Sequence, residues 1–436
     1  MNTIRLLARL GCALMLLVML SCSSSDKDAP LKVEVVKVGN KYQMLVNGQE
    51  YRIKGAGLEF GDCKALADAG ANSFRTWRTE NGRQSGIEVL DIAKKNGLTV
   101  SMCLEIKRER HGMDYSNADS VAAQKEAIRK EVMALKNHPA LLTWIVGNEL
   151  NLGYSNMAVW DAVEDIAKMI KEIDGNHPVT TALAGINKKE IDYIKEHCPT
   201  LDFISIQMYG DIINLQQRIA DAGWINRPYI ITEWGATGHW EMPSTSWGAP
   251  VEQSSSEKAA SIAERYHKAI SQDLNNNLGN YIFLWGQKQE VTPTWYGLFT
   301  DKGYKTEVID FITEVWSGNK PVNSVPQIKS GLLDGKDKYS RIILEKDTQY
   351  NATVEAFDLN SDTLEYHCEV MYESTDRKAG GDHEVRPDSL DGLVLSSVNG
   401  AIVIKAPHEA GQYRLFVYVY DGKGGAGTIN FPFLVE

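Results

Sequence analysis

The chain has 436 residues, a formal net charge of −11 and a hydrophobic content of 43%. This length suggests two domains and supplies enough apolar material for a large core. The acidic balance argues against a nucleic-acid partner, because proteins that bind nucleic acid need a basic face.

The N-terminal residues have the pattern of an export signal. Arg5 and Arg9 make a basic start, and the apolar stretch 10–20 is too short to be a comfortable membrane span. The segment Met19-Leu20-Ser21-Cys22 comes next and resembles a bacterial lipobox, in which the cysteine is lipidated and becomes the mature N-terminus. An ordinary signal peptide followed by a chance cysteine is the alternative.

These features predict a signal peptide over residues 1–21 and a flexible tether over residues 22–30. A lipid on Cys22 would hold the protein on a membrane without spanning it. The polar, acidic residues after Cys22 are similar to the export signals of surface-exposed Gram-negative lipoproteins. We therefore expect an outer-membrane lipoprotein that is exposed on the cell surface or faces the periplasm.

The remaining cysteines do not predict a metal site. They are widely and irregularly spaced, and neither a CxxC pair nor a histidine-rich cluster accompanies them. Cys103 lies in an apolar stretch and is expected to be a buried small hydrophobe.

Strand and helix patterns alternate along the first two thirds of the chain. Apolar, β-branched stretches predict strands over 51–57, 71–77, 98–104, 141–148, 179–184, 202–208, 228–234 and 280–286. Amphipathic stretches predict helices over 62–69, 86–96, 120–136, 156–173, 188–197, 212–222, 256–275 and 306–316. Eight such units are typical of a (β/α)8 barrel. A doubly wound open sheet is the alternative, but the glycine-rich phosphate turn that usually marks one is missing.

The barrel pattern extends over residues 31–318, and a short hairpin with a turn at Asn47-Gly48 opens it. A segment rich in glycine, asparagine and proline begins the predicted linker, residues 319–340. Short alternating segments then follow over residues 341–436, at intervals typical of a β-sandwich. The fold class is therefore α/β, a (β/α)8 barrel followed by a small all-β sandwich.

The C-terminal segments around Ala356-Phe357-Asp358 and Tyr420-Asp421-Gly422 resemble immunoglobulin-, cadherin- or PKD-type modules of secreted bacterial enzymes. Asp358, Asp362 and Asp421 could hold calcium. Aspartates that cap turns are the favoured alternative, because the sequence has no dense Asp-x-Asp run.

Two glutamates follow buried strands. Asn148 and Glu149 come directly after the apolar run 141–146 and Gly147, and Glu233 follows the apolar run 228–232. A carboxylate at the end of a buried strand is costly unless it has a partner or a task. In a parallel barrel, the C-terminal strand ends meet at the catalytic face, and glycoside cleavage needs two carboxylates there. Other carboxylates near strand ends or loops are Glu59, Glu80, Glu105, Glu241 and Glu290.

This arrangement resembles the clan A glycoside hydrolases. Counting strands places Glu149, in its Asn-Glu pair, after the fourth strand and Glu233 after the seventh, as in that clan. The resemblance covers residues 32–316. The chain is similar to the catalytic barrel of family 2, but it lacks the large N-terminal domains of many family members. Short barrel enzymes with a C-terminal immunoglobulin-like module, such as the endo-β-1,3-glucanases of family 158, are an equally good match.

The resemblance implies a retaining mechanism. Glu149 would be the general acid and then the general base, with a pKa raised in part by the neighbouring carboxylate. Glu233 would stay ionised and attack the anomeric carbon. No metal or organic cofactor is needed.

The resemblance also implies further site residues. Asn148 would hydrogen-bond the sugar 2-hydroxyl, Arg75 would orient Glu233, and Tyr209 would hydrogen-bond the nucleophile. A structural salt bridge is the alternative for Arg75, and packing is the alternative for Tyr209.

Aromatic residues complete the candidate substrate-binding set. Trp285 matches a tryptophan of the eighth strand that forms the floor of the sugar subsite. Trp240 and Trp295 lie on loops after the last two strands and suggest a cleft with several sugar platforms. Packing in the core, or packing of loops against the barrel, is the alternative for each.

The preferred function is a retaining endo-β-glucanase that acts on a polysaccharide or oligosaccharide, with a β-1,3-glucan as one candidate. Aromatic-rich loops, surface tethering and the missing N-terminal domains support endo action. The alternative is an exo-β-glycosidase of family 2 type, such as a β-galactosidase or a β-mannosidase. A non-catalytic surface glycan-binding lipoprotein is the alternative of another class, although two buried acids have no use in a binder.

Overall fold

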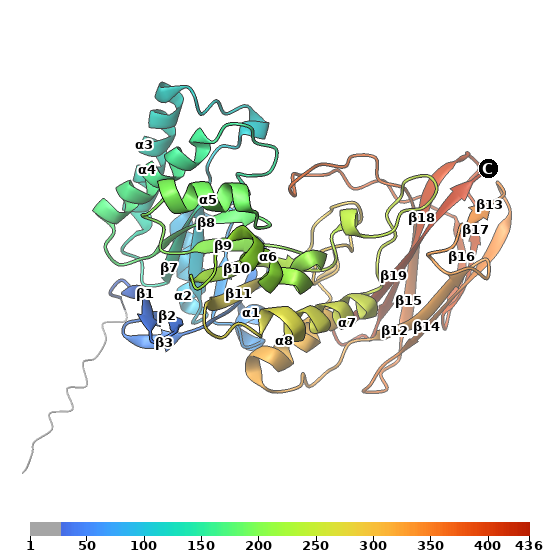
Figure 1. The fold of residues 1–436 in the computed structure, drawn as a ribbon. Coiled ribbons are helices and arrows are strands. Elements are labelled where there is room, and N and C mark those ends of the chain that lie inside the picture. Colours follow the sequence, from blue (N-terminus) through green and yellow to red (C-terminus); the bar gives the residue numbers. More distant parts are fainter. Residues whose placement is uncertain (1–27) are drawn as a thin grey trace, which may run out of the picture.

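The computed structural model describes residues 28–436 (Figure 1). The predicted signal peptide, the lipidation at Cys22 and most of the tether lie outside the described residues. Within the described part of the chain, no helix is long and apolar enough to cross a membrane.

Eight parallel strands close into a barrel, in the order β10-β11-β4-β5-β6-β7-β8-β9. The predicted strands all exist, with ends shifted by a few residues. In chain order they are β4 (Ile53–Gly57), β5 (Ser73–Arg75), β6 (Thr99–Leu104), β7 (Leu141–Asn148), β8 (Val179–Ala184), β9 (Ile204–Gln207), β10 (Tyr229–Gly235) and β11 (Asn277–Phe283). The barrel closes because β11 pairs with both β10 and β4. The predicted (β/α)8 barrel is therefore confirmed.

Helices surround the barrel and connect its strands (Figure 1). They are α1 (Cys63–Asp68), α2 (Gly86–Lys95), α3 (Ala118–Leu135), α4 (Ala158–Ile173), α5 (Lys188–His197), α6 (Leu215–Ala222), α7 (Ser255–Arg265) and α8 (Glu307–Ser317). The predicted helix 256–275 is too long, because α7 ends at Arg265 and a single π turn, Tyr266–Ile270, follows. Asp273 then accepts hydrogen bonds from the backbone N–H groups of Asn275 and Asn276, which makes a turn that a helix cannot continue.

A three-stranded antiparallel meander precedes the barrel: β1 (Val33–Val38), β2 (Lys41–Val46) and β3 (Gln49–Tyr51). Its apolar side chains pack with residues of the barrel, most of them at or near the N-terminal ends of strands. The shared cluster contains Val33, Met44, Ile53, Leu142, Phe203, Ile230, Leu278 and Tyr281. The meander therefore covers the N-terminal end of the barrel, opposite the C-terminal strand ends.

Two four-stranded sheets form the C-terminal sandwich. One sheet contains β12 (Gln327–Leu333), β14 (Gln349–Phe357), β17 (Ala401–Lys405) and β16 (Val394–Val398). The other contains β13 (Ile343–Leu344), β19 (Ala426–Val435), β18 (Gly411–Tyr420) and β15 (Glu365–Tyr372). The linker prediction over 319–340 is wrong for residues 327–333, because they form β12, which pairs with β14. Gly331 obscures the strand pattern, yet a Cβ there would lie 2.7 Å from the Phe431 ring.

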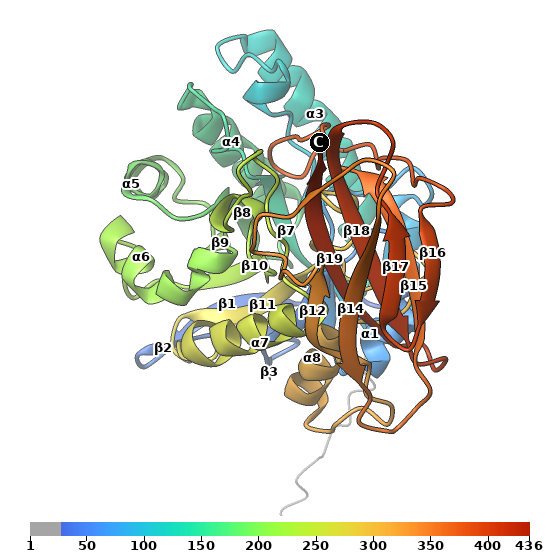
Figure 2. The ribbon, with the colours of Figure 1, turned by 90° about the vertical axis from the view of Figure 1, so that its right-hand side faces the viewer.

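The sandwich packs closely against the barrel. Figure 1 shows α7 between the two, and α7 contacts β12 and β19. Figure 2, turned by 90°, shows the sandwich strands crossing in front of the barrel. Buried polar contacts fix the interface: Arg414 donates to the Pro250 carbonyl at 2.8 Å and pairs with Glu373 at 2.9 Å, and Asn430 donates to Glu252 at 2.6 Å. Each of these buried groups would be costly to leave unpaired, so the sandwich holds one position on the barrel.

Candidate active site

The end of β7 places Glu149 at the mouth of the barrel. The strand is buried along its whole length and turns at Gly147, which has a φ of +76°. A Cβ at Gly147 would lie 2.6 Å from Leu150 Cδ1, so this turn requires glycine. Glu149 itself has a φ of +53°, and its backbone N–H donates to the Ala182 carbonyl at 2.9 Å. The constrained turn directs the carboxyl over the C-terminal end of the fourth barrel strand.

Glu233 lies at the corresponding end of β10, the seventh barrel strand, and is only 5% exposed. Its Oε1 accepts hydrogen bonds from Arg75 Nη1 at 2.7 Å, Trp77 Nε1 at 2.8 Å and Gln207 Nε2 at 3.0 Å. Its Oε2 accepts from the Tyr209 hydroxyl at 2.8 Å. These four donors match a carboxylate that carries negative charge and hold it in one orientation.

Arg75 connects the two strand ends from below. Its side chain is fully buried, and its Nη2 donates to Asn148 Oδ1 at 2.8 Å. Gln207 donates to the same oxygen at 2.7 Å. The Asn148 oxygen is thus engaged by protein donors, and the amide nitrogen is the group that can donate to a sugar hydroxyl. Arg75 acts on the site through Glu233 and Asn148, since no part of it is exposed to a ligand.

Replacing Arg75 by methionine is expected to cost about 3–5 kcal/mol of stability, because Glu233 would keep a buried charge without its cation. Hydrolytic activity should fall as well, since two oriented side chains lose a shared donor. Arg78→Met is the matched control: its ion pair with Glu59 is partly exposed and should contribute less than about 1 kcal/mol. Urea unfolding of the two variants measures the difference, and equal losses would contradict the assigned role.

The Glu149 carboxyl keeps its proton at neutral pH. Burial, and then the charge of Glu233, raise its pKa to about 8, whereas Arg108 and Arg75 act in the opposite direction. Arg108 is held in place by its Nε, which donates to the Asn148 carbonyl at 3.0 Å. Two neighbouring carboxyls in different environments thus provide one proton donor and one anion, which is the requirement for acid-assisted displacement.

The raised pKa of Glu149 predicts a pH-dependent stability. The unfolded carboxyl ionises near its ordinary pKa of 4.5, and the folded one near 8. The stabilisation from the protonated form is therefore complete below the unfolded pKa and is lost as pH rises through the folded pKa. In thermal unfolding, the melting temperature of Glu149→Gln minus that of the wild type should increase from pH 5 to pH 8. A constant difference across this window would refute the shift.

Both glutamates line one cavity of about 890 Å³ at the barrel mouth. Asn148 and Tyr209 line it too, as does Trp240, which is 62% exposed and packs edge to face against Tyr209 with ring centroids 5.7 Å apart. The structure thus brings together Glu149, Glu233, Asn148, Tyr209 and Trp240, with Arg75 beneath them.

The predictions for Trp285 and Trp295 are wrong. Each side chain is 1% exposed, so neither can offer a face to a sugar. Trp285 donates to the Asp62 carbonyl at 3.1 Å and packs against Trp316 of α8, outside the barrel. Trp295 donates to the Thr237 carbonyl at 2.8 Å and fixes a loop. Strand β11 ends at Phe283, earlier than predicted, so Phe283 and Leu284 line the cavity in place of Trp285.

Three further residues form hydrogen bonds with the site residues, and they were not predicted from the sequence. Trp77 and Gln207 donate to Glu233, and Arg108 donates to the Asn148 carbonyl. Gln207 carried a usable signal, because it is a polar residue at the C-terminal end of the buried strand β9, as Glu149 and Glu233 lie at or near the ends of theirs. Trp77 and Arg108 lie beyond strand ends, where sequence periodicity does not say which way a side chain points.

Structural partners engage three of the other candidate carboxylates, Glu59, Glu241 and Glu290. Glu105 lines the same cavity as Glu149 and Glu233. Glu241 accepts from the backbone N–H groups of Gly210, Asp211 and Gly238 and shapes a loop. Glu290 pairs with Lys288 at 2.8 Å.

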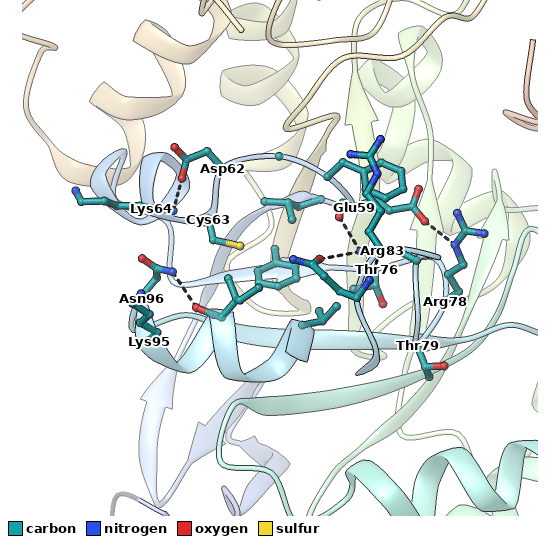
Figure 3. Close-up of a pocket in the computed structure, with 18 residues that line it drawn as sticks. Glu59, Asp62, Cys63, Lys64, Thr76, Arg78, Thr79, Arg83, Lys95 and Asn96 are labelled. Atoms are coloured by element: carbon teal, nitrogen blue, oxygen red, sulfur yellow. Dashed lines mark hydrogen bonds and ion pairs between the residues drawn. The ribbon is translucent and has the colours of Figure 1, made fainter. Parts of the chain in front are cut away.

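Glu59 pairs with Arg78 at 2.6 Å beside a second cavity, of about 450 Å³, between α1 and α2 (Figure 3). Cys63 and Lys64 lie on its α1 side, and Asn96 lies at the end of α2. Neither Glu149 nor Glu233 lines this second cavity.

The three C-terminal aspartates that could hold calcium do come together. One carboxylate oxygen each from Asp358, Asp362 and Asp421 lies within 4.8 Å of the others. Asp421 Oδ1 accepts from the backbone N–H groups of Lys423 and Gly425 at 2.7 and 2.8 Å. These contacts agree with the capping of turns, the alternative that the sequence favours.

A closed parallel barrel that carries a proton-bearing glutamate after its fourth strand and a second glutamate after its seventh defines the class of clan A glycoside hydrolases. Within that class, the family model "Glycosyl hydrolases family 2, TIM barrel domain" matches residues 58–290, more than half of the chain. The chain therefore belongs to glycosyl hydrolase family 2.

β-Glucuronidases are among the relatives that the chain resembles. One from Streptococcus agalactiae is 27% identical over an alignment of 212 residues that covers 43% of this chain and 34% of the relative. One from Sus scrofa is 24% identical over an alignment of 275 residues that covers 56% of this chain and 39% of the relative. The chain thus spans less than two fifths of the length of either. Among solved structures, a Bacteroides uniformis β-glucuronidase superposes with a TM-score of 0.50 at 14% identity, over 93% of this chain and 48% of that one.

Proposed function

We propose that the protein is a retaining β-glycosidase that removes a terminal β-linked sugar. The observation that carries this proposal is the carboxyl pair: Glu149 holds a proton to about pH 8, beside a Glu233 that four donors orient, in one cavity. A non-catalytic glycan binder has no need for this difference between two neighbouring acids.

The mechanism has two steps. Glu149 gives its proton to the glycosidic oxygen as that oxygen leaves, and a Glu233 oxygen bonds to the anomeric carbon. Glu149, now a carboxylate, then takes a proton from the water that attacks the same carbon, and Glu233 leaves. Two inversions give net retention. Asn148 can donate to the sugar 2-hydroxyl, a contact that strengthens as positive charge develops on the ring.

Exo action is favoured over the endo action that the sequence suggested. The cavity of about 890 Å³ falls in the range of roughly 300–1,000 Å³ typical of sites that enclose one small ligand. The relatives are named for β-glucuronides, so a terminal β-D-glucuronic acid is the first sugar to test.

An endo-β-glucanase is the second candidate, because Trp240 offers an exposed ring at the cavity rim. A sugar next to the cleaved one could stack on that ring.

A panel of 4-nitrophenyl β-glycosides tests the proposal directly. The panel holds the glucuronide, galactoside, glucoside and mannoside, and laminarin is digested in parallel with product sizing. Exo action should release monosaccharide alone, and endo action should release a ladder of oligosaccharides. Proton NMR of the first-formed sugar should show the β-anomer. Initial formation of the α-anomer would overturn the retaining mechanism, and inactivity on the whole panel and on laminarin would overturn the enzyme proposal.

We further propose that Cys22 carries a lipid that holds the enzyme at the outer membrane, on the strength of the segment Met19 to Cys22. Expression with radiolabelled palmitate should label the wild type and leave Cys22→Ala unlabelled. An unlabelled wild type would leave an ordinary signal peptide as the remaining interpretation.

A further inference from the structure

A loop of the sandwich reaches the catalytic cavity. Residues 373–393 connect β15 to β16, and they exceed the roughly 12–15 residues beyond which an irregular loop is uncommon and usually functional. Within this loop, residues 377–382 line the same cavity as Glu149 and Glu233. We call residues 376–384 the strap.

Loops from several barrel strands hold the strap at defined points. After β6, Arg110 pairs with Asp382 at 2.6 Å. After β10, the Gly248 carbonyl accepts from Arg377 at 3.0 Å. The strap thus bridges segments on different sides of the barrel mouth.

The loop after β11 provides two more contacts. Lys288 Nζ donates to the Gly381 carbonyl at 2.7 Å, and the Val291 N–H donates to Glu384 at 2.6 Å. Lys288 also lines the cavity and pairs with the buried Glu290. These bonds fix the strap against residues that themselves surround the substrate.

The tip of the strap packs against the loop that carries Glu149. Gly380 has a φ of +65°, and a Cβ there would lie 2.6 Å from Leu152 Cδ2 and 2.7 Å from Arg110 Nη2. Leu152 is three residues after Glu149, its backbone N–H donates to the Glu149 carbonyl at 3.0 Å, and it lines the cavity. A general acid stands beside the oxygen of the leaving group. The strap tip therefore lies on the side of the cavity where the leaving group departs.

We propose that the strap is the binding surface for the leaving group, which makes the sandwich part of the active site. The Lys378 ammonium donates to the His383 carbonyl at 2.7 Å and lies 3.4 Å from an Asp376 carboxylate oxygen, which leaves it further donor capacity. Together with the peptide groups of residues 379–381, it suits a leaving group rich in hydroxyls, such as a second sugar. This proposal deepens the proposed glycosidase function and rests on it for its kinetic test.

Two strap variants and a matched control test the proposal. Lys378→Ala removes the donor, and Gly380→Ala pushes the tip away from Leu152 and Arg110. Gly392→Ala is the control, because Gly392 lies in the same loop at a φ of +74° with no atom near its Cβ position. All three variants are compared on the best 4-nitrophenyl β-glycoside and on the β-linked disaccharide of the same sugar.

Both strap variants should lose about 10-fold or more in kcat/KM on the disaccharide and less than about 2-fold on the aryl glycoside. Gly392→Ala should change neither. Equal losses on the two substrates, or no loss on the disaccharide in Lys378→Ala, would overturn the proposal. Lys378 is partly exposed, so that variant is informative even if Gly380→Ala folds poorly.

A binding measurement separates this proposal from the proposed function. If the wild type cleaves no glycoside, the function fails, and calorimetry then tests the strap alone with laminaribiose as the probe. Glu233→Gln protein with an intact strap should bind the disaccharide at least about 10-fold more tightly than the same protein with Lys378→Ala. Equal affinities, or no binding by either protein, would overturn the strap proposal.

Discussion

Glu233→Gln is expected to lower kcat by about 10⁴-fold or more on every glycoside that the wild type cleaves. The amide cannot attack the anomeric carbon, whereas the donors around it, Arg75, Trp77, Gln207 and Tyr209, still bind a group of the same shape. Substrate affinity should therefore change far less than kcat. Stopped assays with long incubation measure the residual rate.

The control separates lost chemistry from lost folding. Glu164 on α4 is also a buried glutamate, 3% exposed, and it accepts hydrogen bonds from Thr200, far from the cavity. Glu164→Gln should keep kcat within about 3-fold of the wild type even if its melting temperature falls.

Chemical rescue makes the test of Glu233 sharper. In Glu233→Ala, azide can occupy the space left by the carboxylate and attack the anomeric carbon from the same face. The product should be the α-glycosyl azide. A β-glycosyl azide, or full activity without azide, would contradict the nucleophile assignment.

Glu149→Gln should slow the cleavage of glycosides with poor leaving groups by about 10²–10⁴-fold, since such groups need a proton as they depart. Departure of 2,4-dinitrophenolate needs no proton, so the first step on that glycoside should be nearly unaffected. The second step still lacks its general base, and the glycosyl-enzyme should accumulate. A burst of dinitrophenolate followed by slow turnover is the expected trace.

The same assignment fixes the alkaline limit of activity. The acid must be protonated at the start of the reaction, and its pKa is raised to about 8. The kcat/KM of the wild type on an alkyl glycoside should therefore fall as pH rises through about 8, and Glu149→Gln should lack this limb. Identical losses on good and poor leaving groups, or an unchanged alkaline limb, would contradict the role of Glu149.

Much of the barrel can be predicted from sequence because its signals are local. Apolar strands and amphipathic helices alternate with regular spacing, and a parallel barrel then requires the strand ends to meet. Glu149, Asn148 and Glu233 follow from that requirement alone. Each lies within two residues of the end of a long buried strand. A small error in the predicted strand boundary therefore still leaves the side chain at the C-terminal end of the barrel.

Trp285 shows where this reasoning fails. The predicted eighth strand extends three residues beyond the observed end at Phe283. Side chains of a strand alternate between its two faces, and the chain changes direction after the strand ends. The error in the strand end therefore assigned Trp285 to the cavity, whereas its side chain lies in the core. The strap lies further out of reach, because Arg110 and Asp382 are 272 residues apart and meet only through the docking of one β-sandwich on the barrel.

The position of the meander of β1, β2 and β3 bears on how the enzyme would be oriented at a membrane. It covers the N-terminal end of the barrel, so the first described strands lie opposite the cavity that Glu149 and Glu233 line. A lipid on Cys22 would consequently place the N-terminal end of the barrel next to the membrane, and the cavity would open toward the solvent. Dissolved glycans could then reach Glu149 and Glu233 from the solvent side.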